Sequence, residues 1–332
     1  MGDVAMCVPV VWSLAYKYKD VEIFFLSRKN FAPMFAQLPE NVKFIGIDLK
    51  NDYKGLAGLN RLFRQIKEMK VDAFADLHNV LRTKYLRFRT FLAGIKNQVI
   101  NKGRLEKKHL TNKGAVNSKP LKTTISRYQD VFSKLGFQFD LDFKSIFQGK
   151  DVPIPAEVSA VTGEKNSQWI GIAPFAAHKG KILPLQTMEN VVKSLTEKGL
   201  KVFLFGAGSK ETAVLEGWQN TCKGAISVAG KLGGLANELI LISNLDCMVS
   251  MDSANMHLAS LVGTRAVSVW GATHPAAGFF GFNQQEDDAV QLPLPCRPCS
   301  IYGNKECKLS SKYQCLNDIT AEMVIEKILK QK

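Results

Sequence analysis

Short apolar runs alternate with helix-length segments throughout the second half of the chain. Runs such as Lys201–Phe205 and Ala266–Trp270 are largely apolar on both faces, as buried strands of a parallel sheet are. The segments between such runs are long enough to form helices. The pattern predicts strands at Trp169–Ala173, Lys201–Phe205, Ile226–Val228, Cys247–Met251 and Ala266–Trp270, and helices at Leu185–Glu197, Ser209–Thr221, Leu235–Ser243, Ala254–Leu261 and Ile319–Lys330.

The first half repeats the alternation. Strands are predicted at Val21–Leu26, Val42–Ile47 and Val71–Leu77, and a helix at Tyr53–Met69. Strands that alternate with helices form parallel sheets joined by right-handed crossovers. We therefore predict two α/β domains in tandem, each a doubly wound, Rossmann-like parallel sheet.

Residues 148–155 mark the predicted boundary between these domains, because one Gly and two Pro interrupt the alternation there. We place the N-terminal domain at residues 1–150 and the C-terminal domain at residues 151–332. The last predicted helix has Asp318 or Thr320 available as its N-cap. We expect this helix to pack back on the first domain.

The charge is distributed unevenly between the two halves. Residues 1–150 carry 27 Lys and Arg against 13 Asp and Glu, whereas residues 151–332 carry 17 against 17. The whole excess of +14 therefore lies in the first half. The electrostatic field of this positive charge attracts a polyanion. The candidates are nucleic acid, an anionic membrane surface and a phosphorylated carbohydrate. A solvated basic face that only keeps the protein soluble is the alternative.

The composition excludes several classes of protein. With 332 residues, 46% of them hydrophobic, the chain has the composition of a globular protein of two domains. Its apolar runs fall short of the roughly 20 residues that a spanning helix needs, and Met1–Asp3 lacks a basic leader. The seven Cys are an odd number in a chain that needs no disulfide staples, which favours reduced thiols. We expect a cytoplasmic protein.

Candidate site residues follow the predicted strands, because sites in such sheets lie beyond the carboxyl ends of strands. Asp252 and Ser253 lead from one strand into the helix that carries His257, and Thr273 lies in the loop after the next strand. Backbone N–H groups at a helix start, with a serine beside them, bind phosphate oxygens. The alternative makes Asp252 and Ser253 ordinary N-caps and His257 a core histidine.

Three further loops carry charged residues next to a turn. Lys179 and Lys181 follow the strand that opens the second domain, and a lysine there stabilises a leaving diphosphate as a point charge. Glu211 follows the Gly206–Gly208 turn, which lacks the third glycine of a dinucleotide fingerprint. Asp3, beside Gly2, lies where a glycine turn leads into a helix, and it serves there either as a cap or as a general base.

These loops together resemble those of the lipopolysaccharide heptosyltransferases of glycosyltransferase family 9. The resemblance spans essentially the whole chain in the right order, from Gly2-Asp3 to the Gly271–Pro275 loop. Its most specific part is the Asp-Ser-x-x-x-His segment at residues 252–257. The resemblance implies the GT-B fold, in which two Rossmann-like domains face a cleft.

The resemblance also implies an activity and the residues for it. It implies an inverting, metal-independent transfer of heptose from a nucleotide diphosphate sugar, usually ADP-heptose, to the lipopolysaccharide inner core, with no cofactor. Asp3 would deprotonate the acceptor and Lys181 would neutralise the departing diphosphate. The basic first domain would receive an anionic, lipid-linked oligosaccharide at the cytoplasmic face of the inner membrane. The donor would contact Lys179, Glu211, Asp252, Ser253, Ala254, His257 and Thr273, and the acceptor Arg82, Lys84 and Arg87.

Two departures from the family pattern concern the first strand and the donor loop. The family has a β-strand before its Gly-Asp turn, and Met1 leaves no residues for one, so neighbouring strands would lack backbone partners. We expect a chain extended at this end to be more stable and more active; equal melting temperature and turnover would contradict this. Ala176 and Ala177 replace hydroxyl residues that some members place before the lysine, which bears on donor identity.

Four cysteines near the C-terminus leave two alternatives. The spacing is Cys-x2-Cys-x7-Cys-x7-Cys, formed by Cys296, Cys299, Cys307 and Cys315. One close pair of thiols and two spaced thiols can bind a zinc ion tetrahedrally. A zinc ribbon normally has two close pairs, however, and the family's cysteine-bearing loop implies no metal. We expect no bound metal, with structural zinc as the alternative.

Three rival functions explain parts of the sequence. Another GT-B glycosyltransferase with a different sugar nucleotide would share every loop described above. A nucleic-acid-binding protein would account for the basic half, but the aromatic residues follow no RNA-binding pattern, so we expect no nucleic acid partner. An inactive scaffold would account for the missing strand.

Overall fold

The computed structural model describes residues 1–116, 118–149 and 151–330. The chain folds as two compact units. The first comprises Met1, Asp3–Arg104 and Lys122–Ile146, and the second Gly2, Leu105–Leu121 and Phe147–Lys332. The domain boundary predicted at residue 150 falls on a position outside the described residues and remains a prediction.

The second unit contains one six-stranded parallel sheet, and each strand predicted there is confirmed to within a residue or two. The strand order is β10-β9-β8-β5-β6-β7, which is the doubly wound order of a Rossmann fold. The strands are β5 (Trp169–Ala173), β6 (Lys201–Leu204), β7 (Ala225–Ser227), β8 (Cys247–Met251), β9 (Ala266–Val269) and β10 (Ala289–Val290).

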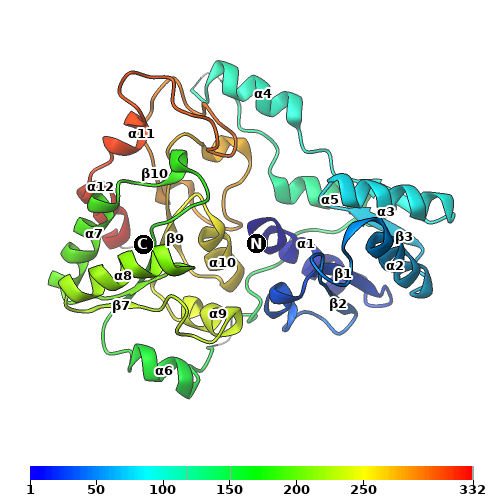
Figure 1. The fold of residues 1–332 in the computed structure, drawn as a ribbon, viewed down its shortest axis with the longest axis horizontal. Coiled ribbons are helices and arrows are strands. Elements are labelled where there is room, and N and C mark those ends of the chain that lie inside the picture. Colours follow the sequence, from blue (N-terminus) through cyan, green and yellow to red (C-terminus); the bar gives the residue numbers. More distant parts are fainter. Residues whose placement is uncertain (117, 150, 331–332) are drawn as a thin grey trace. The chain divides into compact units, whose positions relative to one another are not determined.

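Helices cover both faces of this sheet. Figure 1 shows α7 (Leu185–Glu197), α8 (Ser209–Thr221) and α12 (Ala321–Leu329) on one side and α9 (Leu235–Ser243) and α10 (Ala254–Val262) on the other. This sandwiching explains why every residue of β5, β8 and β9 is buried. The unit also contains α6 (Ala156–Thr162), α11 (Gln314–Asn317) and the 3₁₀ helices η2 (Lys179–Lys181), η3 (Pro275–Ala277) and η4 (Glu286–Asp288).

The last helix packs within the second unit. Its main contacts are with α7, β9 and β10. Packing of this helix on the first domain stays a prediction. The Thr320 hydroxyl caps it by accepting a hydrogen bond from the Met323 N–H at 3.4 Å, so Thr320 is the cap, as one of the two candidates predicted. Arg265, directly before β9, pairs with Asp288 (Nη2 to Oδ1, 2.6 Å) and donates to the Lys327 carbonyl of α12.

The first unit holds two separate two-stranded parallel sheets instead of the single sheet that we predicted. One pairs β1 (Ile23–Arg28) with β2 (Val42–Ile47), and the other pairs β3 (Ala73–Asp76) with β4 (Lys96–Val99). The three predicted strands are present, but no ladder among the described residues joins the pairs. Apolar side chains of β1 are accordingly only half-buried.

Three helices connect these strands in chain order: the 3₁₀ helix η1 (Lys29–Phe35), α2 (Gly55–Glu68) and α3 (Leu81–Leu92). Helix α1 (Gly2–Lys17) precedes the strands, and α5 (Thr124–Leu135) follows them. In α5, the Thr123 hydroxyl accepts from the Ser126 N–H at 3.1 Å, and Gly136 ends the helix in the left-handed conformation. Among the described residues, no helix combines the length and the apolarity needed to cross a membrane.

One basic segment of the first half belongs to the second unit. This segment, Leu105–Leu121, contains all but the first residue of helix α4 (Arg104–Lys113). Its Leu121 N–H donates to the Ala276 carbonyl at 2.8 Å. The first unit therefore carries 22 Lys and Arg against 12 Asp and Glu, and the second 22 against 18. The first unit keeps a net charge of +10, while the second is weakly basic, at +4.

Candidate functional site

Two loops of the second unit meet where the strand order of its sheet reverses. Strand β5 pairs with β6 on one side and with β8 on the other, and ligands of such folds bind beyond the strand ends at this switch point. Lys181, in the loop after β5, forms an ion pair with Asp252, directly after β8, at 2.8 Å between Nζ and Oδ2. Their side chains are only 16% and 5% exposed. Two predicted site residues 71 positions apart are thereby joined.

The start of helix α10 is not capped by a side chain. Ser253 is the N-cap residue, but its hydroxyl makes no cap hydrogen bond and lies 3.0 Å from the Ser250 hydroxyl. Asp252 is engaged with Lys181. Ser253 therefore occupies the N-cap position, but neither side chain caps α10 through a hydrogen bond. The first backbone N–H groups of a helix, including that of Ala254, lack intrahelical partners and favour an anion.

Glycines allow the loops of the switch point to approach closely. A Cβ added to Gly303 would lie 2.6 Å from Cγ of Lys181, and one added to Gly271 would lie 2.7 Å from the Gly180 carbonyl oxygen. The Ala272 N–H donates to the same Gly180 carbonyl at 2.8 Å. The Lys181 stem is therefore confined by neighbouring backbone.

Thr273 and His257 are both buried beside these loops. Thr273 is 1% exposed, and its hydroxyl has no hydrogen-bond partner among the described residues. A buried hydroxyl without a partner is costly unless a water or ligand satisfies it. His257 is 7% exposed within α10. Both side chains are where the sequence predicted them, after β9 and within the helix that follows β8.

Arg297 is a residue of this region that the sequence analysis missed. The residue is 1% exposed. Its guanidinium donates to the carbonyls of Trp270 (3.0 Å), Gly271 (2.6 Å) and Thr273 (2.9 Å), and also to the Leu292 carbonyl and the Gln291 side chain. No carboxylate pairs with it among the described residues. Burial lowers the pKa of Arg297 to about 10, so it stays charged at neutral pH. Arg297 holds the Gly271–Thr273 loop through hydrogen bonds to the loop carbonyls, and its guanidinium adds a positive charge next to the loop.

The lowered pKa of His274, in the same loop, makes the stability of the protein depend on pH. Its Nδ1 accepts from the Ala276 N–H at 3.1 Å. Burial, with the Arg297 charge, lowers the pKa of His274 from 6.5 to about 4. Between these values the unfolded chain binds a proton that the folded chain does not, so the free energy of unfolding falls as pH drops through this window and is fully retained above it.

Replacing His274 by asparagine tests this dependence. The amide oxygen of His274→Asn can replace Nδ1 as the acceptor, but the side chain does not titrate. We expect the melting temperature of the variant to fall less than that of the wild type between pH 6.5 and pH 4. Thermal melts followed by circular dichroism measure this, and identical slopes for the two proteins would contradict it.

Glu211 lies in the first turn of α8, and Lys179 begins η2. The Glu211 carboxylate accepts from the Ala207 N–H at 2.8 Å and so closes the glycine turn in front of α8. One carboxylate oxygen is thereby used locally, and a contact with the donor remains a prediction. Lys179 is exposed in η2.

Asp3 lies in the first turn of α1, where the helix dipole favours a carboxylate. It is exposed. Its charge acts on several groups of the first unit, raising the pKa values of Cys7 and Tyr128 after the larger effect of burial. Burial lowers the pKa of His78, and the Asp3 charge opposes that shift. His78 is thus a titratable neighbour of the predicted base that no motif indicated.

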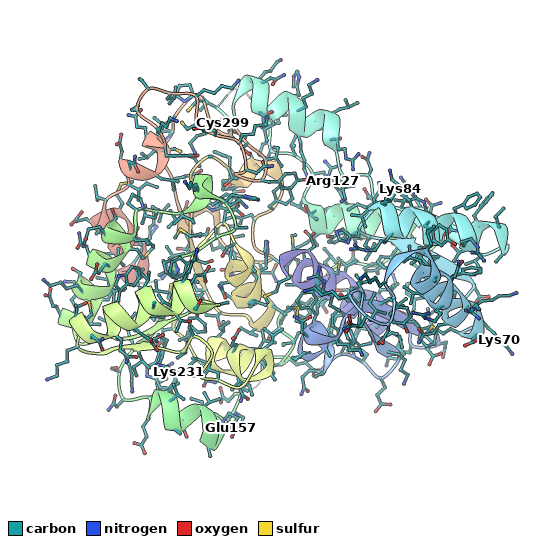
Figure 2. The ribbon with its side chains drawn as sticks, viewed as in Figure 1. Lys70, Lys84, Arg127, Glu157, Lys231 and Cys299 are labelled. Carbon is teal, nitrogen blue, oxygen red and sulfur yellow. The ribbon has the colours of Figure 1, made fainter. Side chains whose placement is uncertain are left out.

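The three predicted acceptor residues differ in their surroundings. Arg87 pairs with buried Asp76 at 2.9 Å, and Asp76 also accepts from the N–H groups of His78 and Asn79. Arg87 therefore fixes the turn after β3. Arg82 and Lys84 are exposed on α3, and Figure 2 labels Lys84.

The four cysteines of the tail are free thiols. Cys296 is exposed, Cys299 and Cys307 are half-buried and Cys315 is buried; Figure 2 labels Cys299. Burial raises the pKa of Cys315 to about 11, which keeps this thiol protonated at neutral pH. Within the described part of the chain, no three His, Cys, Asp or Glu side chains are placed to hold one metal ion. The absence of a bound metal stays a prediction, with structural zinc as its alternative.

The chain is similar to known proteins in both sequence and fold. Residues 59–310 match the sequence model of glycosyltransferase family 9 (heptosyltransferase). Lipooligosaccharide heptosyltransferase 2 of Haemophilus influenzae is 26% identical over 356 residues, covering 99% of this chain and 95% of the relative.

Solved structures agree with this match. A family 9 glycosyltransferase from Veillonella parvula superposes with a TM-score of 0.73 at 18% identity, covering 100% of this chain and 95% of that one. ADP-heptose LPS heptosyltransferase II of Escherichia coli gives 0.66 at 19% identity, covering 98% and 94%. These likenesses confirm the predicted GT-B fold class, and the sequence match covers about three quarters of the chain. The chain therefore belongs to glycosyltransferase family 9, the heptosyltransferase family, and is a glycosyltransferase.

Proposed function

We propose that this enzyme transfers heptose from ADP-heptose to the inner core of lipopolysaccharide, with inversion at the anomeric carbon and without a metal or other cofactor. The names of the similar proteins support both substrates: one is a lipooligosaccharide heptosyltransferase and another an ADP-heptose LPS heptosyltransferase. The observation that carries the proposal is the cluster of Lys181, Asp252 and the uncapped start of α10 at the switch point of the second unit.

This cluster has the features of a diphosphate site. The α10 amides donate hydrogen bonds to phosphate oxygens, and the Lys181 ammonium supplies a positive charge in a poorly solvated place. Asp252 orients Lys181 in the free enzyme. Buried Arg297 fixes the Gly271–Thr273 loop from below. In this proposal, Thr273 and His257 complete the donor pocket, and Glu211 and Lys179 contact the nucleoside side.

The transfer needs a base on the acceptor and a cation on the leaving group. Asp3 accepts the proton of the attacking acceptor hydroxyl, whose oxygen bonds to the anomeric carbon. The bond between that carbon and the diphosphate oxygen breaks on the opposite face, and ADP leaves with its new charge beside Lys181. Lysine and helix amides supply the charge that a metal ion supplies in other transferases. Attack opposite to the leaving group inverts the configuration.

The acceptor in this proposal is an anionic oligosaccharide linked to lipid. The first unit, with its net charge of +10, attracts acidic sugars and phosphates. Arg82 and Lys84 are exposed for such contacts. Arg87, paired with Asp76, supports the loop that carries His78. Because the acceptor is anchored in a bilayer, the enzyme works at a membrane surface, which we assign to the cytoplasmic face of the inner membrane.

Titration calorimetry with a panel of nucleoside diphosphates tests the donor site. We expect ADP to bind more tightly than UDP or GDP. Lys181→Ala should weaken ADP binding by about tenfold to a hundredfold, since a charge-assisted contact contributes roughly 1.5–3 kcal/mol. Lys193→Ala, which removes an exposed lysine of α7 paired with Glu197, is the control and should bind ADP as the wild type does. Tighter binding of UDP, or full ADP affinity in Lys181→Ala, would contradict the proposal.

A further inference from the structure

The inner face of helix α3 packs against the other elements of the first unit. Leu86 is 5% exposed and packs in a small core with Leu62, Phe63 and Ile66 of α2. Thr90 is completely buried, and its hydroxyl contacts the Asn97 side chain at 2.8 Å. This face holds the helix against α2, β3 and β4.

The outer face of the same helix is apolar and exposed. Leu81, Phe88, Phe91 and Leu92 are 84%, 57%, 69% and 65% exposed. Leu81, Phe88 and Leu92 lie on one line, because seven and eleven residues are close to whole numbers of helical turns. Four of the twelve large hydrophobic side chains that are exposed in the described residues belong to this twelve-residue helix. Scattered exposed leucines are ordinary, but a stripe of four exposed large apolar side chains on one short helix marks an interaction surface.

Cations border the stripe, and α3 contains no acidic residue. Arg82 and Lys84 are exposed and have no ion-pair partner in the described ranges. The other two arginines are held inside: Arg87 pairs with Asp76, and the Arg89 guanidinium lies 4.4 Å from the centre of the Phe63 ring. The free charge of the helix thus lies beside its exposed apolar residues, within a unit of net charge +10.

We propose that the outer face of α3 docks on the surface of an anionic phospholipid bilayer. Phe and Leu side chains enter the boundary between headgroups and acyl chains, while the long stems of Arg82 and Lys84 let their charges remain among the phosphates. Negative lipids attract each basic residue near the surface. A protein partner would bury the apolar stripe but would not require cations on its borders, and RNA would use the cations but not the leucines. The bilayer uses both features.

This docking surface requires neither donor nor reaction, so it can be tested separately from the proposed function. Purified enzyme is sedimented with vesicles of phosphatidylcholine alone and of phosphatidylcholine mixed with phosphatidylglycerol, without nucleotide sugar. We expect stronger binding to the anionic vesicles, weakened by salt. The triple variant Leu81→Ser, Phe88→Ser, Leu92→Ser should lose about a hundredfold in affinity or more, because transfer of apolar surface drives the insertion.

Two further variants separate the contributions. Arg82→Ser with Lys84→Ser should lower affinity for anionic vesicles by about tenfold and leave weak binding to neutral vesicles unchanged. Leu309→Ser, which removes an exposed leucine of the second unit, is the control and should bind as the wild type does. Melting curves and ADP titration establish that each variant is folded.

Several outcomes would overturn the proposal. Equal vesicle binding by the triple variant and the wild type would remove α3 from the contact, and wild-type protein that stays in the supernatant would remove the contact altogether. A wild-type dimer that the triple variant converts to a monomer would assign the stripe to a second copy of the chain. Tighter binding to RNA than to anionic vesicles, lost in Arg82→Ser with Lys84→Ser, would assign the cations to nucleic acid.

Discussion

Asp3→Asn should lower turnover by about 10²–10⁴-fold while ADP binding stays unchanged. The substitution keeps the size of the side chain and its place in the first turn of α1 but removes the carboxylate that accepts the proton, and general bases contribute rate factors of this size. Turnover is measured as release of ADP with acceptor present, and ADP affinity by calorimetry on the same preparation.

A matched control distinguishes catalysis from a loss of charge. Asp20→Asn removes an exposed carboxylate of the first unit, in the turn after α1, and should leave turnover at the wild-type level. The free energy of unfolding should be the same for both variants within about 0.5 kcal/mol, as for surface substitutions. Wild-type turnover in Asp3→Asn, or a parallel loss of ADP binding, would contradict the role of Asp3 as the base.

Arg297→Met should destabilise the second unit by about 3–5 kcal/mol and abolish measurable ADP binding. The guanidinium donates to three carbonyls of the Trp270–Thr273 loop and to two further acceptors. Methionine fills part of the volume but leaves these buried acceptors without donors, which is costly. Chemical denaturation measures the free energy of unfolding, and calorimetry measures the loss of ADP binding.

Two substitutions control for charge and for general destabilisation. Arg297→Lys keeps the charge but not the planar fork of donors, so it should recover only part of the stability. Arg64→Met, at an exposed position of α2, should change neither measurement. If Arg297→Met unfolds like the wild type and binds ADP normally, the loop does not depend on this residue.

The second unit follows closely from its sequence because its strands are buried on both faces. The residues of β5 and β8 are all buried between helices, so each reads as a short apolar run with clear limits. Because the strand limits are clear, the residues just after the strands could be placed at the end of the sheet where the carboxyl ends of the strands lie. Lys181, Asp252 and Thr273 were therefore predicted as site residues from strand positions and the family resemblance.

The contacts within the site do not follow from the sequence. The pair between Lys181 and Asp252 requires knowing that β5 and β8 are neighbours, which the order of strands along the chain does not state. Arg297 gave no signal, because its partners are mainly backbone carbonyls and any residue supplies a carbonyl. His78 likewise lies in no motif.

The first unit was harder to predict for a related reason. Helix α3 turns Phe88 and Phe91 outward and buries Thr90, so its pattern of apolar residues does not mark the inner face. Its strands are mostly half-buried, and two separate pairs replaced the predicted sheet. The feature that obscured α3 in the sequence is the same outward apolar face that we assign to the bilayer.

The most direct test of the central proposal is a crystal structure of the enzyme with ADP and an acceptor oligosaccharide. We predict a diphosphate oxygen within hydrogen-bond distance of Lys181 Nζ, about 3 Å, at the start of α10. The Asp3 carboxylate should face the acceptor hydroxyl on the side of the anomeric position opposite to the diphosphate. A diphosphate bound away from Lys181, or Asp3 on a surface remote from both ligands, would contradict the mechanism.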